Sequence, residues 1–207
     1  DGSTEIALDY AERLNNCKVI VEKDKGIYDA LNKGTKYASG ELLMLMHSGD
    51  KLEENGFTHC INSQAIDTNK IHAFNFSIEE DVGIKLIKRN KIGRFSTDIK
   101  HPALLIPKKH LEVVQGYPLE FVVSADVYAI HRIIIALFKS DYDHAIVYHD
   151  YSIIVMEPFG FSAELKNFGR KKIEHIKIFY RLEGFGIKLV KLVLHNLLRI
   201  IKVKLFH

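Results

Sequence analysis

Apolar residues recur along the chain with two different periods, one typical of helices and one typical of strands. A helical spacing predicts helices over residues 5–16, 27–38, 53–67 and 124–138. Short runs of apolar and β-branched residues predict strands at 18–21, 42–46, 71–78, 84–89, 103–106 and 146–156. Such a mixture of strands and helices is typical of an α/β fold.

The segment from residue 18 to residue 46 predicts how the sheet is built. Strand 18–21, helix 27–38 and strand 42–46 follow one another in the order of a βαβ unit. The last strand holds five consecutive apolar residues, as expected for a strand that is buried on both faces of a parallel sheet. We therefore expect an α/β, Rossmann-like fold with a mostly parallel central sheet flanked by helices.

The C-terminal segment has a different pattern. Residues 185–206 are mostly apolar, with one cationic stripe formed by Lys188, Lys191, His195, Arg199 and Lys202. Cations near the middle of a bilayer disfavour a spanning helix, so we expect a basic amphipathic helical tail on a membrane surface. Packing within the chain or in a homodimer is the alternative. We predict a domain of residues 1–169 and a tail of residues 170–207.

Composition and charge narrow the class of protein. The chain has 207 residues, of which 47% are hydrophobic, and this excludes a disordered or collagen-like protein. The net charge is +3, but residues 170–207 alone carry ten Lys/Arg against two Asp/Glu, so the rest of the chain is acidic. Cys17 and Cys60 form no CxxC motif, which argues against a disulfide scaffold and fits a reducing cytoplasm.

A short polar motif, His-Ser-Gly-Asp, follows the apolar run 42–46 directly. In open α/β sheets, ligands bind beyond the carboxyl ends of the strands. Asp50 beside a glycine is suited to hold Mg²⁺ or Mn²⁺ against a phosphate, with Ser48 close to the same ligand. The alternative is an ordinary turn followed by a helix cap.

A second polar segment joins strand 18–21 to the helix that begins near residue 27. It mixes acidic, basic and amide side chains: Asp24, Lys25, Asp29, Asn32 and Lys33. Such a mixture is able to bind a diphosphate and the hydroxyl groups of a sugar. The alternative is the solvated start of a helix.

The two segments together carry a resemblance to a known family. The strings EKDKGIYDALNKG (22–34) and ASGELLMLMHSGD (38–50) resemble the family 2 glycosyltransferases of bacterial polysaccharide synthesis, such as those that make exopolysaccharide, O-antigen or colanic acid. The resemblance implies a GT-A fold, a nucleotide-diphosphate sugar donor and a divalent metal ion. The strand and loop that open the family's domain have no counterpart here before Asp1.

The resemblance also implies roles for single residues. Asp1, in Asp-Gly-Ser-Thr, corresponds to an aspartate that contacts the nucleotide base, and His101, before a proline, to a histidine near the metal and the donor phosphates. Asp126 corresponds to the catalytic base, which takes the proton of the attacking acceptor hydroxyl. The alternatives are a structural histidine at 101 and a helix-stabilising aspartate at 126.

These features predict a membrane-peripheral, metal-dependent, inverting glycosyltransferase on the cytoplasmic face of a bacterial membrane. Its partners would be a nucleotide-diphosphate sugar and a lipid-linked or polysaccharide acceptor, with no nucleic acid. The first alternative is a non-catalytic remnant or membrane-associated adaptor that keeps the fold. A nucleotidyltransferase is disfavoured, since no glycine-rich phosphate loop is visible in the sequence.

Overall fold

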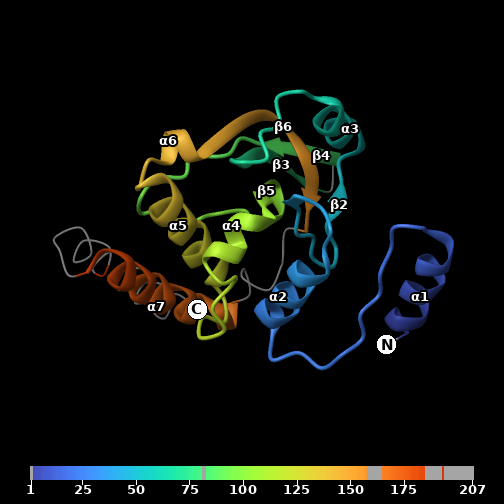
Figure 1. The fold of residues 1–207 in the computed structure, drawn as a ribbon, viewed down its shortest axis with the longest axis horizontal. Helices are drawn as coiled ribbons and strands as arrows, with labels where there is room; N and C mark the ends of the chain where they lie inside the picture. The colour runs from blue at the N-terminus through green and yellow to red at the C-terminus, as the bar shows by residue number, and fades with distance from the viewer. Residues whose placement is uncertain (1, 81–82, 158–164, 185–192, 194–207) are drawn as a thin grey trace.

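The computed structural model describes residues 2–80, 83–157, 165–184 and 193. The helices, including one short 3-10 helix (η1), are α1 (Ser3–Arg13), α2 (Ile27–Tyr37), α3 (Glu54–Asn62), η1 (His101–Ala103), α4 (Lys108–Val113), α5 (Ala125–Phe138), α6 (Tyr142–Ala145) and α7 (Leu165–Glu183). The strands are β1 (Leu42–Leu43), β2 (Lys51–Leu52), β3 (Ile71–Glu80), β4 (Gly83–Ile87), β5 (Leu104–Pro107) and β6 (Ile146–Met156). Figure 1 shows a curved sheet with helices on both sides, which confirms the predicted α/β class.

The sheet has the strand order β1-β5-β3-β6-β2, with β4 paired to β3. Within the described residues, β3 and β6 form the parallel pair, and the other four pairings are antiparallel. The predicted mostly parallel arrangement is therefore wrong. A parallel pair needs a long connection, and β3 and β6 are joined by the long segment that contains β4, β5, α4, α5 and α6. The short return from β3 to β4 can only make an antiparallel hairpin.

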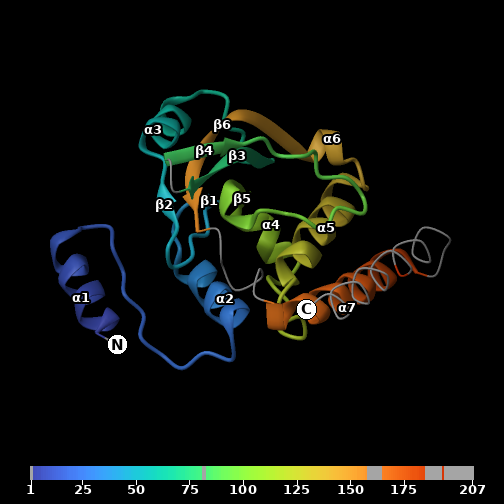
Figure 2. The same cartoon turned by 180° about the vertical axis from the view of Figure 1, so that it is seen from behind.

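The predicted βαβ unit is absent from the described part of the chain. Residues 18–21 are not assigned to a strand, and Val21 is 65% exposed. Of the apolar run 42–46, only Leu42 and Leu43 form a strand, and they pair antiparallel with β5. Helix α1, which buries no residue, and the extended segment after it lie apart from the sheet (Figures 1 and 2). A β-branched run forms a strand only where a neighbouring strand accepts its hydrogen bonds.

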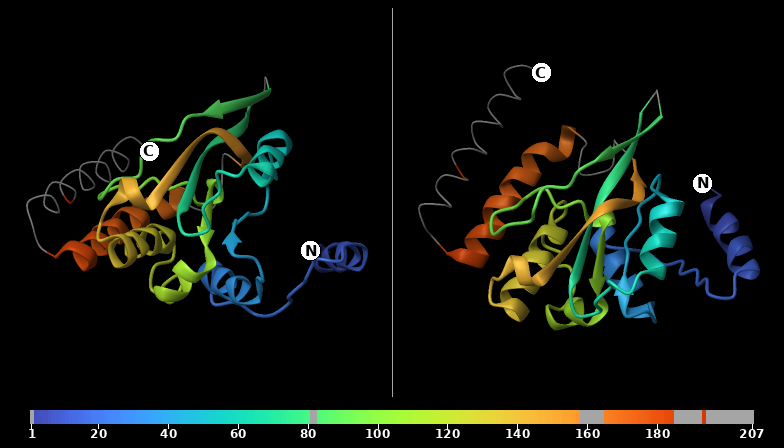
Figure 3. Two further views of the ribbon diagram at one scale, coloured as in Figure 1. Left: turned by 45° about the horizontal axis from the view of Figure 1, so that its top comes forward. Right: turned by 90° about the horizontal axis from the view of Figure 1, so that it is seen from above.

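The core lies on both faces of β3. Alternate side chains of a strand point to opposite faces, and here Ala73 joins the cluster around α5 while Phe74 joins the cluster beneath α3. Figure 3 shows α3 on one side of the sheet and α4, α5 and α6 on the other. The apolar face of α5 is fully buried through Ile130, Ile133 and Ile134. Because α5 is anchored in this way, its first turn has a defined position.

Helix α7 runs through residue 170, where the predicted tail begins, and packs against α5. Its Ile178 and Phe179 are buried in the body of the protein. The predicted amphipathic helix over 185–206 lies outside the described residues, apart from Val193. Among the helices that the structure describes, none is both long enough and apolar enough to span a bilayer.

Glu174 of α7 holds the loop that leads into α5. Its buried carboxylate accepts hydrogen bonds from the backbone N–H groups of Val122, Val123 and Ser124, each at 2.9 Å. Three amide donors are thus satisfied by one side chain from a distant part of the sequence. The contact ties α7 to the start of α5, where Asp126 lies.

Replacing Glu174 by alanine is expected to lower the free energy of unfolding by about 3 kcal/mol, because buried amide donors lose their acceptor. Urea unfolding followed by circular dichroism measures the change. Glu112→Ala is the matched control, since this glutamate is exposed and pairs with Lys108 only at 3.7 Å. Equal stability of the two variants would show that Glu174 does not hold the loop.

Candidate active site

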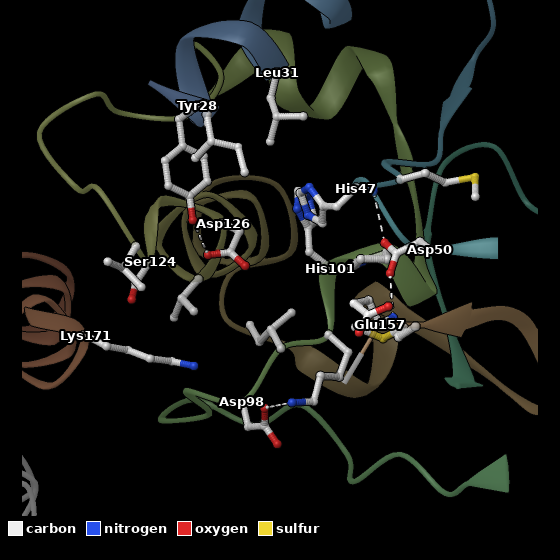
Figure 4. Close-up of a pocket in the computed structure, with 18 of the residues that line it drawn as sticks. Tyr28, Leu31, His47, Asp50, Asp98, His101, Ser124, Asp126, Glu157 and Lys171 are labelled. Carbon is white, nitrogen blue, oxygen red and sulfur yellow. Dashed lines mark hydrogen bonds and ion pairs between the residues drawn. The ribbon is translucent and has the colours of Figure 1, made fainter. Parts of the chain in front are cut away.

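A cavity of about 590 Å³ opens at one edge of the sheet. Its walls come from α2, the loop after β1, the segment 97–102, the first turn of α5, the end of β6 and α7 (Figure 4). The structure brings four predicted site residues from separate parts of the sequence into this cavity: Ser48, Asp50, His101 and Asp126.

Asp126 lies in the first turn of α5 and faces the cavity. The hydroxyl of Tyr28, on α2, donates a hydrogen bond to its Oδ1 atom at 2.9 Å. Burial raises the pKa of Asp126 above the ordinary value, and burial together with the aspartate raises the pKa of Tyr28. A carboxylate with a raised pKa is a stronger proton acceptor when it is ionised, which suits a general base.

Asp50 lies across the cavity from Asp126 (Figure 4). Its two carboxylate oxygens accept backbone N–H groups from His47, at 3.0 Å, and from Glu157, at 3.1 Å. Gly49 allows this close approach: its φ is +91°, and a Cβ atom there would lie 3.1 Å from the Cβ of Glu157. Asp50 therefore joins the loop after β1 to the end of β6, and its orientation is determined by two backbone groups.

The carboxylates of Asp50 and Glu157 are the candidates for holding a metal ion. Figure 4 shows the two residues side by side, and within the described residues neither forms an ion pair. No group of three or more His, Cys, Asp or Glu side chains in the described part forms a metal site. Mg²⁺ is commonly bound by one or two carboxylates together with substrate phosphates, and two adjacent carboxylates fit that type of site.

His101 lies between Asp126 and Asp50 in the view of Figure 4, close to His47. It is buried, and its Nε2 atom is 2.9 Å from the hydroxyl of Tyr117. Burial lowers the pKa of His101 to about 3, so the ring is neutral at physiological pH. A neutral imidazole can ligate a metal, but the contact with Tyr117 occupies the Nε2 atom in this structure. Its role as a metal ligand stays a prediction.

The residues predicted to bind the donor at the start of α2 lie outside the cavity lining. Lys33 pairs with Asp24 at 2.8 Å and with Asp29 at 3.2 Å, and the backbone N–H of Lys25 donates to Asp29 at 2.9 Å. This network closes the turn that leads into α2. Tyr28, Ala30 and Leu31 of the same helix, and Ile27, do line the cavity.

Asn32 has a structural contact instead. Its side chain donates to the carbonyl of Tyr117 and accepts the N–H of Tyr117, both at 2.8 Å. Gly116 is required beside it, because its φ is +74° and a Cβ atom would lie 2.4 Å from Oδ1 of Asn32. The contact joins α2 to the loop that carries Tyr117. The predicted base contact at Asp1 lies outside the described residues.

The cavity also holds titratable side chains that were not predicted from the sequence, among them Tyr28, Asp98, Glu157 and Lys171. Tyr28 lies in the string 22–34 and in the predicted helix 27–38, but it was not among the residues expected to bind a ligand. Lys171 belongs to the basic segment 170–207, which was predicted to be a tail on a membrane surface. The sequence holds no signal that would bring Asp98 or Glu157 to the site, since both lie in loops that reach it through tertiary contacts.

The curled sheet with its flanking helices, and the cavity at the edge of the sheet, define a GT-A-like fold. Residues 1–96 match the model of the family described as Glycosyl transferase family 2. No curated protein sequence matches the chain.

Solved structures share the fold at low sequence identity. TarS 1–349 from S. aureus in complex with UDP-GlcNAc aligns with a TM-score of 0.61 and 12% identity over 95% of this chain and 59% of that one. TarS 1–349 in complex with UDP gives a TM-score of 0.61 at 11% identity, over 95% of this chain and 58% of that one. The mannosyltransferase PcManGT from Pyrobaculum calidifontis, in complex with GDP-Man and Mn²⁺, aligns with a TM-score of 0.59 and 15% identity. The alignment covers 95% of this chain and 56% of that one. The chain thus spans less than two thirds of the length of these proteins.

Proposed function

We propose that the chain transfers a sugar from a nucleotide-diphosphate donor to an acceptor hydroxyl with inversion at the anomeric carbon. The observation that carries this proposal is the cavity, in which Asp126 and Asp50 face each other from separate parts of the sequence. The structures of TarS with UDP-GlcNAc and of PcManGT with GDP-Man and Mn²⁺ support a nucleotide-sugar donor.

The proposed chemistry begins at Asp126. Its carboxylate takes the proton of the acceptor hydroxyl while that oxygen attacks the anomeric carbon of the donor sugar. The bond between the anomeric carbon and the diphosphate oxygen breaks, and the electron pair leaves with the nucleoside diphosphate. Attack from the side opposite the leaving group inverts the anomeric centre. Tyr28 holds the base in place through its hydrogen bond to Oδ1.

Asp50 and Glu157 would hold a divalent cation, Mg²⁺ or Mn²⁺, at the opposite end of the cavity. When bound, the ion supplies positive charge to the departing diphosphate. The two backbone N–H groups that fix Asp50 prepare its carboxylate for this role. His101 is the predicted third partner on this side.

The acceptor is proposed to be a lipid-linked saccharide or a growing polysaccharide on the cytoplasmic face of a bacterial membrane. Helix α7 supports contact with a membrane surface, because cationic and apolar side chains share its exposed face: Arg170, Ile173, Lys177 and Tyr180. Such a face combines attraction to anionic head groups with burial of apolar surface at the lipid boundary.

A thermal-shift screen with UDP, GDP and their sugars, with and without Mn²⁺, tests the function. We expect one nucleotide series to raise the melting temperature in a metal-dependent way, because a ligand that binds the folded state stabilises it. If no nucleotide raises the melting temperature, the chain is a non-catalytic protein that keeps the GT-A-like fold.

A further inference from the structure

Lys171 is a cation inside the candidate active site that has no role in the chemistry proposed above. It comes from α7 and lines the same cavity as Asp126. Figure 4 shows its side chain pointing from α7 into the cavity, on the side of Asp126 and Ser124 and away from Asp50. Burial lowers the pKa of the Lys171 ammonium, so the group is partly removed from water.

The charged neighbours of Lys171 are occupied by other partners. Asp126 accepts the hydroxyl of Tyr28 at 2.9 Å, and Asp98 pairs with Lys100 at 2.8 Å. Within the described residues, Lys171 makes no ion pair or hydrogen bond with either carboxylate. Lys100 and Lys171 are the two lysines among the described cavity residues, and only Lys171 lacks an ion pair there.

Asp126 and Asp98 are near enough to Lys171 to interact with its charge, but neither forms a direct ion pair with it. A partly buried ammonium without a direct ion pair is unfavourable unless something compensates for the lost hydration. A structural ion pair with Asp126 would compensate for it, but the two side chains are not within ion-pair distance of each other. The open cavity beside the ammonium leaves room for a bound anion. A phosphate or carboxylate is the chemical group that would restore the missing interactions.

We propose that Lys171 binds an oxyanion of a substrate in this cavity. The proposal rests on the function proposed above and adds a subsite to it. The oxyanion has two possible sources, a charged group of the acceptor and the diphosphate of the donor. The position of Lys171 beside Asp126, at the end of the cavity away from Asp50, favours the acceptor.

Calorimetric titration with inorganic phosphate tests the subsite without any turnover. We expect the wild-type chain to bind phosphate at millimolar concentration, and Lys171→Met to weaken this binding about tenfold or more, as for the loss of one charge-assisted hydrogen bond. Lys171→Arg should retain most of the binding. Lys36→Met is the matched control, because Lys36 is exposed on α2 and lies outside the cavity lining. This variant should bind phosphate like the wild type.

A second titration, in the presence of Mn²⁺ and the saturating nucleoside diphosphate, identifies the source of the oxyanion. If phosphate still binds when the diphosphate is present, the subsite belongs to the acceptor. If the diphosphate displaces phosphate, the subsite belongs to the donor. If the chain binds no nucleotide but binds phosphate in a way that depends on Lys171, the proposed function is rejected and the subsite is retained. No phosphate binding by the wild type, or equal binding by Lys171→Met, would overturn the subsite.

The melting temperature separates a binding role from a structural one. Methionine keeps the apolar stem and removes a poorly compensated charge, so Lys171→Met should melt at or above the wild-type temperature. A variant that melts well below the wild type would show that Lys171 stabilises the fold, and this would contradict the proposal.

Discussion

Replacing Asp126 by asparagine is expected to lower the turnover number about 10²–10⁴-fold, which is the usual contribution of a general base. Asparagine has nearly the same shape and can still accept the hydrogen bond from Tyr28, so the cavity should keep its geometry. Donor binding should therefore change little. Release of nucleoside diphosphate measures the rate, and calorimetric titration with the diphosphate measures binding.

The matched control is Asp143→Asn, because the side chain of Asp143 is 84% exposed and lies outside the cavity lining. This variant should turn over at the wild-type rate. Wild-type turnover by Asp126→Asn would remove Asp126 from the catalytic role. Equal losses of rate and of donor affinity would mean that the substitution damages the site as a whole.

The pH dependence of the wild type gives an independent view of the same carboxylate. Asp126 must be ionised to accept a proton, and burial raises its pKa. The rate should therefore fall as the pH is lowered through this raised pKa, at a higher pH than for an ordinary aspartate. The residual activity of Asp126→Asn should lack this acidic limb.

Replacing Asp50 by alanine is expected to weaken metal-dependent binding of the nucleotide by at least about tenfold. The substitution removes a carboxylate from the proposed metal site and leaves the N–H groups of His47 and Glu157 without their acceptor. Titration of the nucleotide with and without Mn²⁺ separates the two effects. Only the metal-dependent part of the affinity reports on the cation.

Asp50→Asn separates charge from structure, because asparagine keeps one oxygen for the backbone contacts but carries no negative charge. We expect it to fold like the wild type and to lose the response to Mn²⁺. If Asp50→Ala binds the nucleotide with the same metal dependence as the wild type, the cation is held elsewhere and the role of Asp50 is only to fix the loop.

The predicted helices 27–38, 53–67 and 124–138 correspond to α2, α3 and α5, because their apolar spacing reflects burial against the core. The helix predicted over 5–16 forms as α1 but buries no residue, and the short helices α4 and α6 were not predicted. The prediction over 124–138 corresponds to α5, whose apolar positions Ile130, Ile133 and Ile134 are all fully buried. The direction of strand pairing was not predicted, since an apolar run reports burial and not the partner strand. The run 42–46 looked like a central parallel strand, yet it forms a two-residue strand paired antiparallel to β5.

The candidate site was predicted in part, for a similar reason. Asp50, His101 and Asp126 reach the cavity because each follows or begins a regular element whose position the core determines. The roles of the polar residues 24–33 were harder to predict, since the charged side chains at the start of a helix can bind a ligand or can pair with one another. In this chain Lys33 gathers Asp24 and Asp29 into a local ion-pair network.

Lys171 shows that the pattern of charges along the sequence does not identify which basic residue lies in a site. It belongs to a run of basic residues, and such a run is usually a solvated surface. Within α7, however, neighbouring residues face different surroundings: Lys171 points into the cavity, whereas Arg170 and Lys177 are exposed. Only the packing of α7 against the body of the protein distinguishes the lysine at the site from the cations at the surface.

A crystal structure of the chain with Mn²⁺ and the nucleoside diphosphate that stabilises it would test the proposed donor site most directly. We expect the diphosphate at the Asp50 end of the cavity and open space beside Asp126 and Lys171. A nucleotide bound outside this cavity, or bound with its diphosphate at the Asp126 end, would contradict this proposal.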